Sequence, residues 1–182
     1  GGGLLTDDLI ELRAKGAREA LGITCDVHDN AADLASRRDL DAVVVTTVDC
    51  MHEEHALLAL ENGKHVYIEK PLAITVEGCL NVIEASKRAG KVLSMGFNLR
   101  HNAVVHKLRN LIAEGTFGDI FSIQAIEHYS GGRTYHSRWN RHKAKTGGLW
   151  IHKGSHDFDV INYLMGIQAR PARVACFANL SV

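Results

Sequence analysis

The chain has 182 residues, 46% of them hydrophobic, which suits one ordinary globular domain or one and a half small ones. Its 21 basic residues balance 21 acidic ones, so it lacks the overall positive charge typical of nucleic-acid-binding proteins. Its four cysteines form no CxxC pair, and no apolar run approaches the roughly 20 residues that span a bilayer. We therefore expect a cytoplasmic protein that binds a small molecule and neither nucleic acid nor membrane.

The first predicted element is a helix that follows Thr6. Thr6 suits the N-cap position, acidic residues follow it in the first turn, and Gly22 provides the stop. Three glycines, residues 1–3, stand just before this helix. This opening leads us to expect that an original N-terminus is missing.

Between residues 41 and 97, short strands alternate with helices. The expected strands are 41–47, 65–69 and 91–97, and the expected helices are 53–62 and 75–90. The first of these strands is a continuous β-branched run, which suits a strand covered on both faces. Strand–helix–strand units with short connections need right-handed crossovers, so the sheet is predicted to be parallel. This pattern predicts the back half of a doubly wound α/β domain over residues 1–97.

A doubly wound dinucleotide-binding domain normally begins with a strand and then a G-x-G-x-x-G turn, which holds a pyrophosphate at a helix N-terminus. That motif occurs nowhere in this sequence. The glycines at residues 1–3 are either a remnant of such a turn or the scar of a purification tag.

The pattern changes after Phe97, and we place a second domain over residues 98–182. The predicted elements are a helix over 104–113, a strand over 120–128, a polar loop over 130–148, a helix over 150–164 and a strand over 173–182. The loop is long enough to suggest a functional role.

Lys70 is the first candidate for chemistry. It directly follows a predicted parallel strand, and the carboxyl ends of such strands form the ligand crevice of open α/β sheets. Pro71 restricts Lys70 to extended backbone, which can hold the ammonium group in a defined direction. The same tripeptide also fits a surface lysine at a strand end.

A second candidate group lies in residues 147–159. If this stretch is helical, His152 and His156 share one face and Lys153 lies beside them. Two histidines at this spacing suit metal ligands, proton-transfer groups or half-buried neighbours. With Asp159 they supply three ligands of the kind used by a metal-dependent enzyme.

Between His128 and His156 the chain has no acidic residue. The cations of this segment are Arg133, Arg138, Arg141, Lys143, Lys145 and Lys153. Arginine side chains in such a segment suit recognition of an anionic group such as a carboxylate, although a solvated loop has the same composition. Tyr135 and Trp139 suit stacking on a sugar face or anchoring of the loop.

Several segments, in their order and spacing, resemble the Gfo/Idh/MocA oxidoreductase family, which is named after glucose–fructose oxidoreductase and inositol dehydrogenase. They are the run Thr46 to His52, the tripeptide Glu69-Lys70-Pro71, and G-G-x5-G-x-H-x2-D over residues 147–159. The resemblance covers about residues 31–166. It implies a partial Rossmann-type parallel sheet followed by the start of a smaller α+β substrate domain, in a chain that is incomplete at both ends and need not be active by itself. It also implies NAD or NADP, a sugar, cyclitol or related polyol substrate, and a homo-oligomer formed through the second-domain sheet.

The resemblance also implies roles for individual residues. Lys70 is expected beside nicotinamide and substrate, and His156 is expected to transfer the proton. His152 stands where many family members have Asp, and it joins the catalytic candidates. The expected cofactor contacts are Thr46, Thr47, His52, Glu69 and Lys70. The expected substrate contacts are Arg100 and, from the basic segment described above and independently of the resemblance, Tyr135, Arg138, Trp139, Arg141 and Lys153.

The predicted reaction moves a hydride between the cofactor and a substrate carbon while a proton leaves the substrate oxygen. His156 is suited to take that proton near neutral pH, and Lys70 to stabilise the alkoxide as a fixed positive charge. Two alternatives stay open: a non-catalytic cofactor-sensing or scaffold member of the same fold, and the metal-dependent enzyme described above.

Overall fold

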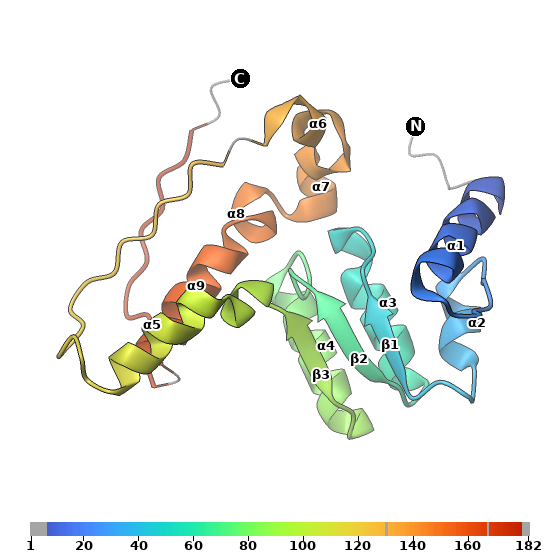
Figure 1. Ribbon diagram of the computed structural model, residues 1–182, viewed down its shortest axis with the longest axis horizontal. Helices are drawn as coiled ribbons and strands as arrows, with labels where there is room; N and C mark the ends of the chain where they lie inside the picture. The colour runs from blue at the N-terminus through green and yellow to red at the C-terminus, as the bar shows by residue number, and fades with distance from the viewer. Residues whose placement is uncertain (1–6, 130, 167, 180–182) are drawn as a thin grey trace.

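A computed structural model describes residues 7–129, 131–166 and 168–179 (Figure 1). The glycines at 1–3, Thr6 and the end of the last predicted strand, 180–182, lie outside the described residues. The first half of the chain contains the helices α1 (Asp7–Leu21), α2 (Ala31–Ser36), α3 (His52–Glu61) and α4 (Val76–Ala89), the 3-10 helix η1 (Asp49–Met51), and the strands β1 (Ala42–Val45), β2 (His65–Glu69) and β3 (Leu93–Gly96).

The strands form a parallel sheet in the order β1-β2-β3, which confirms the predicted topology. In its register Ile68 pairs with Val45 on one side and with Met95 on the other. The core lies between this sheet and helices α3 and α4, where Leu60 and Val82 pack with Val45 and Ile68.

The opposite face of the sheet is open: the side chain of Val44 is 63% exposed. The prediction that the first strand is covered on both faces is therefore wrong within the described residues. Both crossovers run in the same direction along the sheet, and right-handed crossovers of one direction place their helices, α3 and α4, on one face (Figure 1).

Local capping sets the bounds of α4, as the sequence predicts. The Thr75 hydroxyl accepts a hydrogen bond from the Gly78 amide at 3.0 Å, and Gly90 ends the helix at a left-handed φ of 63°. Gly22, with a φ of 64°, ends α1 in the same way.

The second half of the chain contains η2 (Asn98–His101), α5 (Ala103–Ala113), α6 (Gly132–Ser137), η3 (Trp139–Arg141), α7 (Lys143–Thr146), α8 (Leu149–His152) and α9 (Ser155–Met165). Helices α5 and α9 pack against each other, and α7 contacts η1 near the end of β1. Figure 1 shows the short helices α6 and α7 above the sheet, on the side where the strands end. No helix among the described residues is long and apolar enough to cross a membrane.

Three predictions for this half need correction. Residues 120–128 and 173–179 are extended, but neither segment belongs to a strand in the described part of the chain, because neither has a ladder partner. The predicted loop over 130–148 contains three short helices, α6, η3 and α7.

The helix expected over 150–164 is broken at Lys153 and Gly154 into α8 and α9. At Gly154 the chain passes so close to the preceding turn that an added Cβ would lie 2.9 Å from the Trp150 carbonyl oxygen. His152 and His156 therefore stand on different helices rather than on one face.

Candidate active site

The carboxyl end of the sheet is held together by His52. Its buried ring lies with Nδ1 2.6 Å from the Pro71 carbonyl oxygen and Nε2 3.1 Å from the Thr47 carbonyl oxygen. The ring thus joins the chain after β1 to the chain after β2 and supports the segment that carries Lys70. The expectation that His52 contacts the cofactor is corrected, because both of its nitrogens face backbone carbonyls.

Lys70 connects the two halves of the chain. Its Nζ donates a hydrogen bond to the carbonyl oxygen of His152, at the end of α8. Partial burial lowers the pKa of Lys70, the Asp49 carboxylate acts in the opposite direction, and the positive charge of Lys153 lowers it further. The ammonium group is therefore partly desolvated and held at the junction of β2 and α8.

His152 is also held from the sheet side. Its Nδ1 lies 2.5 Å from a carboxylate oxygen of Asp49 in η1, and both side chains are buried. Its Nε2 lies 3.3 Å from the Asn140 side-chain nitrogen. The rings of Tyr135 and Trp139, expected to contact a substrate, pack at 5.8 Å and 5.5 Å from the His152 ring centre.

His156 lies in the same region, with its ring 6.2 Å from that of Phe97 at the end of β3. Its Nδ1 is buried and has no hydrogen-bond partner among the described residues. Burial lowers the pKa of His156, and the nearby charges of Lys70 and Lys153 lower it further. Lys153 itself places its Nζ 4.0 Å from the ring centre of Tyr129. The structure thus brings Lys70, His152 and His156 together.

Arg100 has a structural partner. Its guanidinium donates two hydrogen bonds, of 2.8 Å and 2.5 Å, to the buried carboxylate of Asp159, and it lies 5.4 Å from the ring centre of Tyr163. The guanidinium thus pairs with the buried carboxylate of Asp159, and the expected contact of Arg100 with the substrate stays a prediction.

Two of the three side chains proposed as metal ligands are bound to other side chains of the protein. Asp159 binds Arg100, and His152 binds Asp49. Among the described residues, no group of three His, Cys, Asp or Glu side chains is placed to hold a metal ion.

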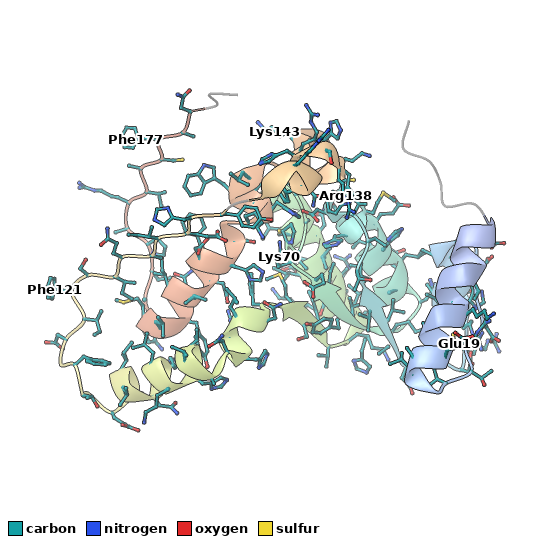
Figure 2. The ribbon with its side chains drawn as sticks, turned by 45° about the horizontal axis from the view of Figure 1, so that its top comes forward. Glu19, Lys70, Phe121, Arg138, Lys143 and Phe177 are labelled. Carbon is teal, nitrogen blue, oxygen red and sulfur yellow. The ribbon has the colours of Figure 1, made fainter. Side chains whose placement is uncertain are left out.

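Arg138 and Arg141 are exposed on and beside η3. Figure 2 shows Arg138 and Lys143 near the short helices over the strand ends, with Lys70 below them in that view. The cations of this segment are therefore on the same side of the sheet as the carboxyl ends of the strands.

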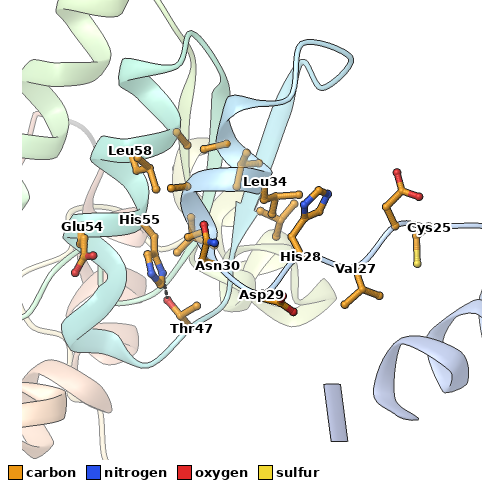
Figure 3. A pocket seen from close by; sticks show the side chains of 18 of the residues that line it. Cys25, Val27, His28, Asp29, Asn30, Leu34, Thr47, Glu54, His55 and Leu58 are labelled. Carbon is orange, nitrogen blue, oxygen red and sulfur yellow. Dashed lines mark hydrogen bonds between the residues drawn. The ribbon is translucent and has the colours of Figure 1, made fainter. Parts of the chain in front are cut away.

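A hollow of about 840 Å³ lies between α2, β1 and α3 (Figure 3). Polar side chains that line it include His28, Asn30, Thr47 and His55, and the Thr47 hydroxyl lies 3.1 Å from Nδ1 of His55. Of the other expected cofactor contacts, Thr46 is exposed just after β1 and Glu69 ends β2.

Two models of one family match the chain in succession. Residues 8–97 match the model described as "Oxidoreductase family, NAD-binding Rossmann fold", and residues 109–175 match "Oxidoreductase family, C-terminal alpha/beta domain". The chain belongs to the Gfo/Idh/MocA oxidoreductase family. This confirms the predicted family and the predicted fold class.

Several Gfo/Idh/MocA proteins are similar to this chain. Inositol 2-dehydrogenase of Klebsiella pneumoniae subsp. pneumoniae is 31% identical over 169 residues, which are 90% of this chain and 48% of that protein. The 2,7-anhydro-N-acetylneuraminate hydratase of Escherichia coli (strain K12) is 32% identical over 133 residues, 73% of this chain and 36% of that protein. The structure of levoglucosan dehydrogenase in complex with NADH and levoglucosan superposes with a TM-score of 0.74 at 29% identity, covering 86% of this chain and 42% of that one. The chain thus spans about half or less of the length of these relatives.

Two residues of this Gfo/Idh/MocA site were not among the sequence-based candidates, namely Asp49 and Asn140. Asp49 has a usable signal, because it follows β1 at the edge where the strands end. Asn140 has none, because its neighbour His152 is brought to it only by the turn between α7 and α8.

Proposed function

We propose that this protein is an oxidoreductase that uses NAD or NADP to transfer a hydride to or from a CH–OH group of a sugar, cyclitol or related polyol. The observation that carries the proposal is the meeting of Lys70, from the end of β2, with His152 and His156, from α8 and α9. The names of the relatives, inositol 2-dehydrogenase and levoglucosan dehydrogenase, support the substrate class.

The residues at the strand ends suit a nicotinamide cofactor. The buried Nδ1 of His156 has no partner among the described residues, so a polar group is still to be bound there. Thr46, Thr47, Glu69 and Lys70 would hold the group along the carboxyl ends of β1 and β2, where ligands bind in open α/β sheets. When bound, the nicotinamide supplies the hydride acceptor or donor.

The protein's own residues stabilise the charge on the substrate oxygen and transfer its proton. The Lys70 ammonium, fixed by the His152 carbonyl, stabilises the negative charge that develops on the substrate oxygen. Because its pKa is lowered, His156 is neutral near pH 7 and is able to accept the proton of the hydroxyl group.

Replacement of His156 tests this assignment. His156→Ala is expected to lower kcat by about 10²–10⁴-fold, the usual contribution of a positioned acid–base group. Reduction of NAD and NADP, followed by nicotinamide absorbance over a panel of polyols, measures it, and nicotinamide fluorescence checks that cofactor binding persists. His142→Ala, at an exposed histidine, is the control. Full turnover by His156→Ala would remove His156 from the mechanism, and cofactor binding without turnover by the wild type would favour the non-catalytic alternative.

The finer proposal is an anionic substrate. Arg138 and Arg141 are exposed on the same side as Lys70, where they can form bidentate contacts with a carboxylate. We expect the Arg138→Gln/Arg141→Gln double variant to raise KM for carboxylated sugars and to leave KM for neutral ones unchanged. Equal effects on both classes of sugar would contradict the proposal of an anionic substrate.

A homo-oligomer formed through the second domain and a cytoplasmic location are also proposals. Analytical ultracentrifugation tests the first of them.

A further inference from the structure

The contact between Asp49 and His152 carries an inference beyond this function. It joins two side chains that are 103 positions apart, and it lies buried where the two halves of the chain meet. The carboxylate that faces His152 comes from η1, on the sheet side of the contact. The residues proposed so far for the reaction give Asp49 no role.

We propose that Asp49 is a positioning residue that fixes the ring of His152 with its hydrogen on Nδ1, and that His152 thereby accepts and returns a substrate proton at Nε2, as a second acid–base group beside His156. The proposal rests on the proposed function for its chemistry. The assignment of the hydrogen to one ring nitrogen of His152 rests on the contacts of that ring alone.

The neighbours of His152 select one tautomer. A carboxylate can only accept, so the nitrogen that lies 2.5 Å from Asp49, Nδ1, bears the hydrogen. The neutral ring then has an unprotonated Nε2, and the Asn140 amide nitrogen at 3.3 Å donates to it. Both neighbours therefore favour Nδ1–H with Nε2 as the basic atom.

His152 also sets the position of Lys70. The carbonyl oxygen of His152 accepts the hydrogen bond of the Lys70 ammonium, while its ring is held by Asp49. Tyr135 and Trp139 flank the ring and restrict its rotation. Asp49 thus anchors the residue that presents both a basic nitrogen and the oxygen that orients the cation.

In a substrate orientation that presents the hydroxyl to His152 rather than to His156, the hydroxyl takes the place of the Asn140 amide at Nε2, its O–H bond breaks, and an N–H bond forms at Nε2. A bound nicotinamide would supply the hydride acceptor, so that the electron pair of the broken C–H bond would leave as hydride while the alcohol is oxidised to a carbonyl. The positive ring that results is stabilised by the Asp49 carboxylate at Nδ1.

The first test reads the ring directly and needs no substrate. In the ¹⁵N-labelled chain, ring nitrogen shifts assigned with His152→Gln are expected to show a protonated Nδ1 and an unprotonated Nε2. In Asp49→Leu, which cannot accept, the hydrogen is expected to move to Nε2 or to exchange between both nitrogens. Nε2–H in the wild type, or an unchanged Nδ1–H ring in Asp49→Leu, would overturn the proposal.

The second test separates positioning from a structural role. In the cofactor-loaded protein, Asp49→Asn is expected to lower kcat by roughly 10²–10⁴-fold and to change KM by less than about threefold, because it disturbs a proton carrier and not substrate binding. Asp119→Asn, at an exposed carboxylate, is the matched control with unchanged kcat. Unchanged kcat in Asp49→Asn would overturn the role of His152. A wild-type protein with the Nδ1–H ring that oxidises no polyol would support the positioning and contradict the proposed function.

Discussion

The three-stranded sheet and the extended segments 120–128 and 173–179 differ in whether their backbone is paired with a neighbouring strand and whether their apolar side chains are buried. Each strand of the sheet has a hydrogen-bonded neighbour, and Ile68 at its centre is 0% exposed. In the two segments no residue belongs to a strand, and Phe121 is 99% exposed. The contrast shows that extended backbone is stabilised by hydrogen-bonded neighbours, and that among the described residues only β1, β2 and β3 have such neighbours.

The largest change in the free energy of unfolding is expected when an isoleucine of the sheet is truncated, and an isoleucine of the extended segment serves as the comparison. Ile68→Ala leaves a cavity in a packed core and should lower the free energy of unfolding by about 2–5 kcal/mol. Ile126→Ala, at a side chain that is 66% exposed in the extended segment, should change it by less than about 0.5 kcal/mol. Urea unfolding followed by circular dichroism measures both. Similar losses in the two variants would show that the segment is packed like the sheet.

The second half of the chain is fixed instead by the ion pair between Arg100 and Asp159. Arg100→Ala leaves the Asp159 carboxylate buried and unpaired, which should cost about 2–3 kcal/mol, less than for a fully buried pair because Arg100 is partly exposed. Arg109→Ala is the matched control: Arg109 also lies over Tyr163, at 5.7 Å, and its loss should cost under about 1 kcal/mol. Equal losses would assign the stability to the arginine–tyrosine contacts rather than to the ion pair.

A smaller change in stability is expected for a substitution in the turn that joins α7 to α8. Gly147 has a φ of 73°, and an added Cβ would lie 2.7 Å from Ile151 Cδ1 and 3.1 Å from the Ile74 carbonyl oxygen. Gly147→Ala should therefore destabilise the protein by about 1 kcal/mol or more. Gly16→Ala, in α1 with no heavy atom within 4 Å of the added Cβ, should stabilise it by about 0.4–1 kcal/mol. Thermal unfolding compares the two, and a loss at both positions would contradict the account of the turn.

The sequence predicts the sheet well because its signals are local. Thr75 and Gly90 mark the two ends of α4, and the β-branched run before Thr46 marks β1. The same signals fail for residues 120–128, because a strand depends on a partner that lies elsewhere in the chain or outside it. The break at Gly154 was also missed, since the close approach of Trp150 that requires it is a tertiary contact.

In the candidate site, too, the sequence predicts what local patterns encode and not the contacts between distant residues. Lys70 was found from its place after a parallel strand, and the family motif pointed to His156. The motif could not show that Arg100 binds Asp159, that His52 faces two carbonyl oxygens, or that Asp49 faces His152. The contacts of His52 with Pro71, of Arg100 with Asp159 and of Asp49 with His152 join residues 19 to 103 positions apart, and no local pattern encodes them.

The central claim is that Lys70 and His156 share one site, and the titration of His156 tests it most directly. Burial and the charges of Lys70 and Lys153 lower the pKa of His156 in the folded chain. On acidification the unfolded chain therefore binds this proton first, so the contribution of His156 to stability is present above its ordinary pKa and is lost as pH falls through the lowered one.

NMR titration of the wild type should give a midpoint for His156 below the ordinary histidine value. Lys70→Met should move this midpoint upward, and Lys107→Met, at an exposed lysine on α5, should leave it in place. A midpoint that does not respond to the loss of Lys70 would contradict the account.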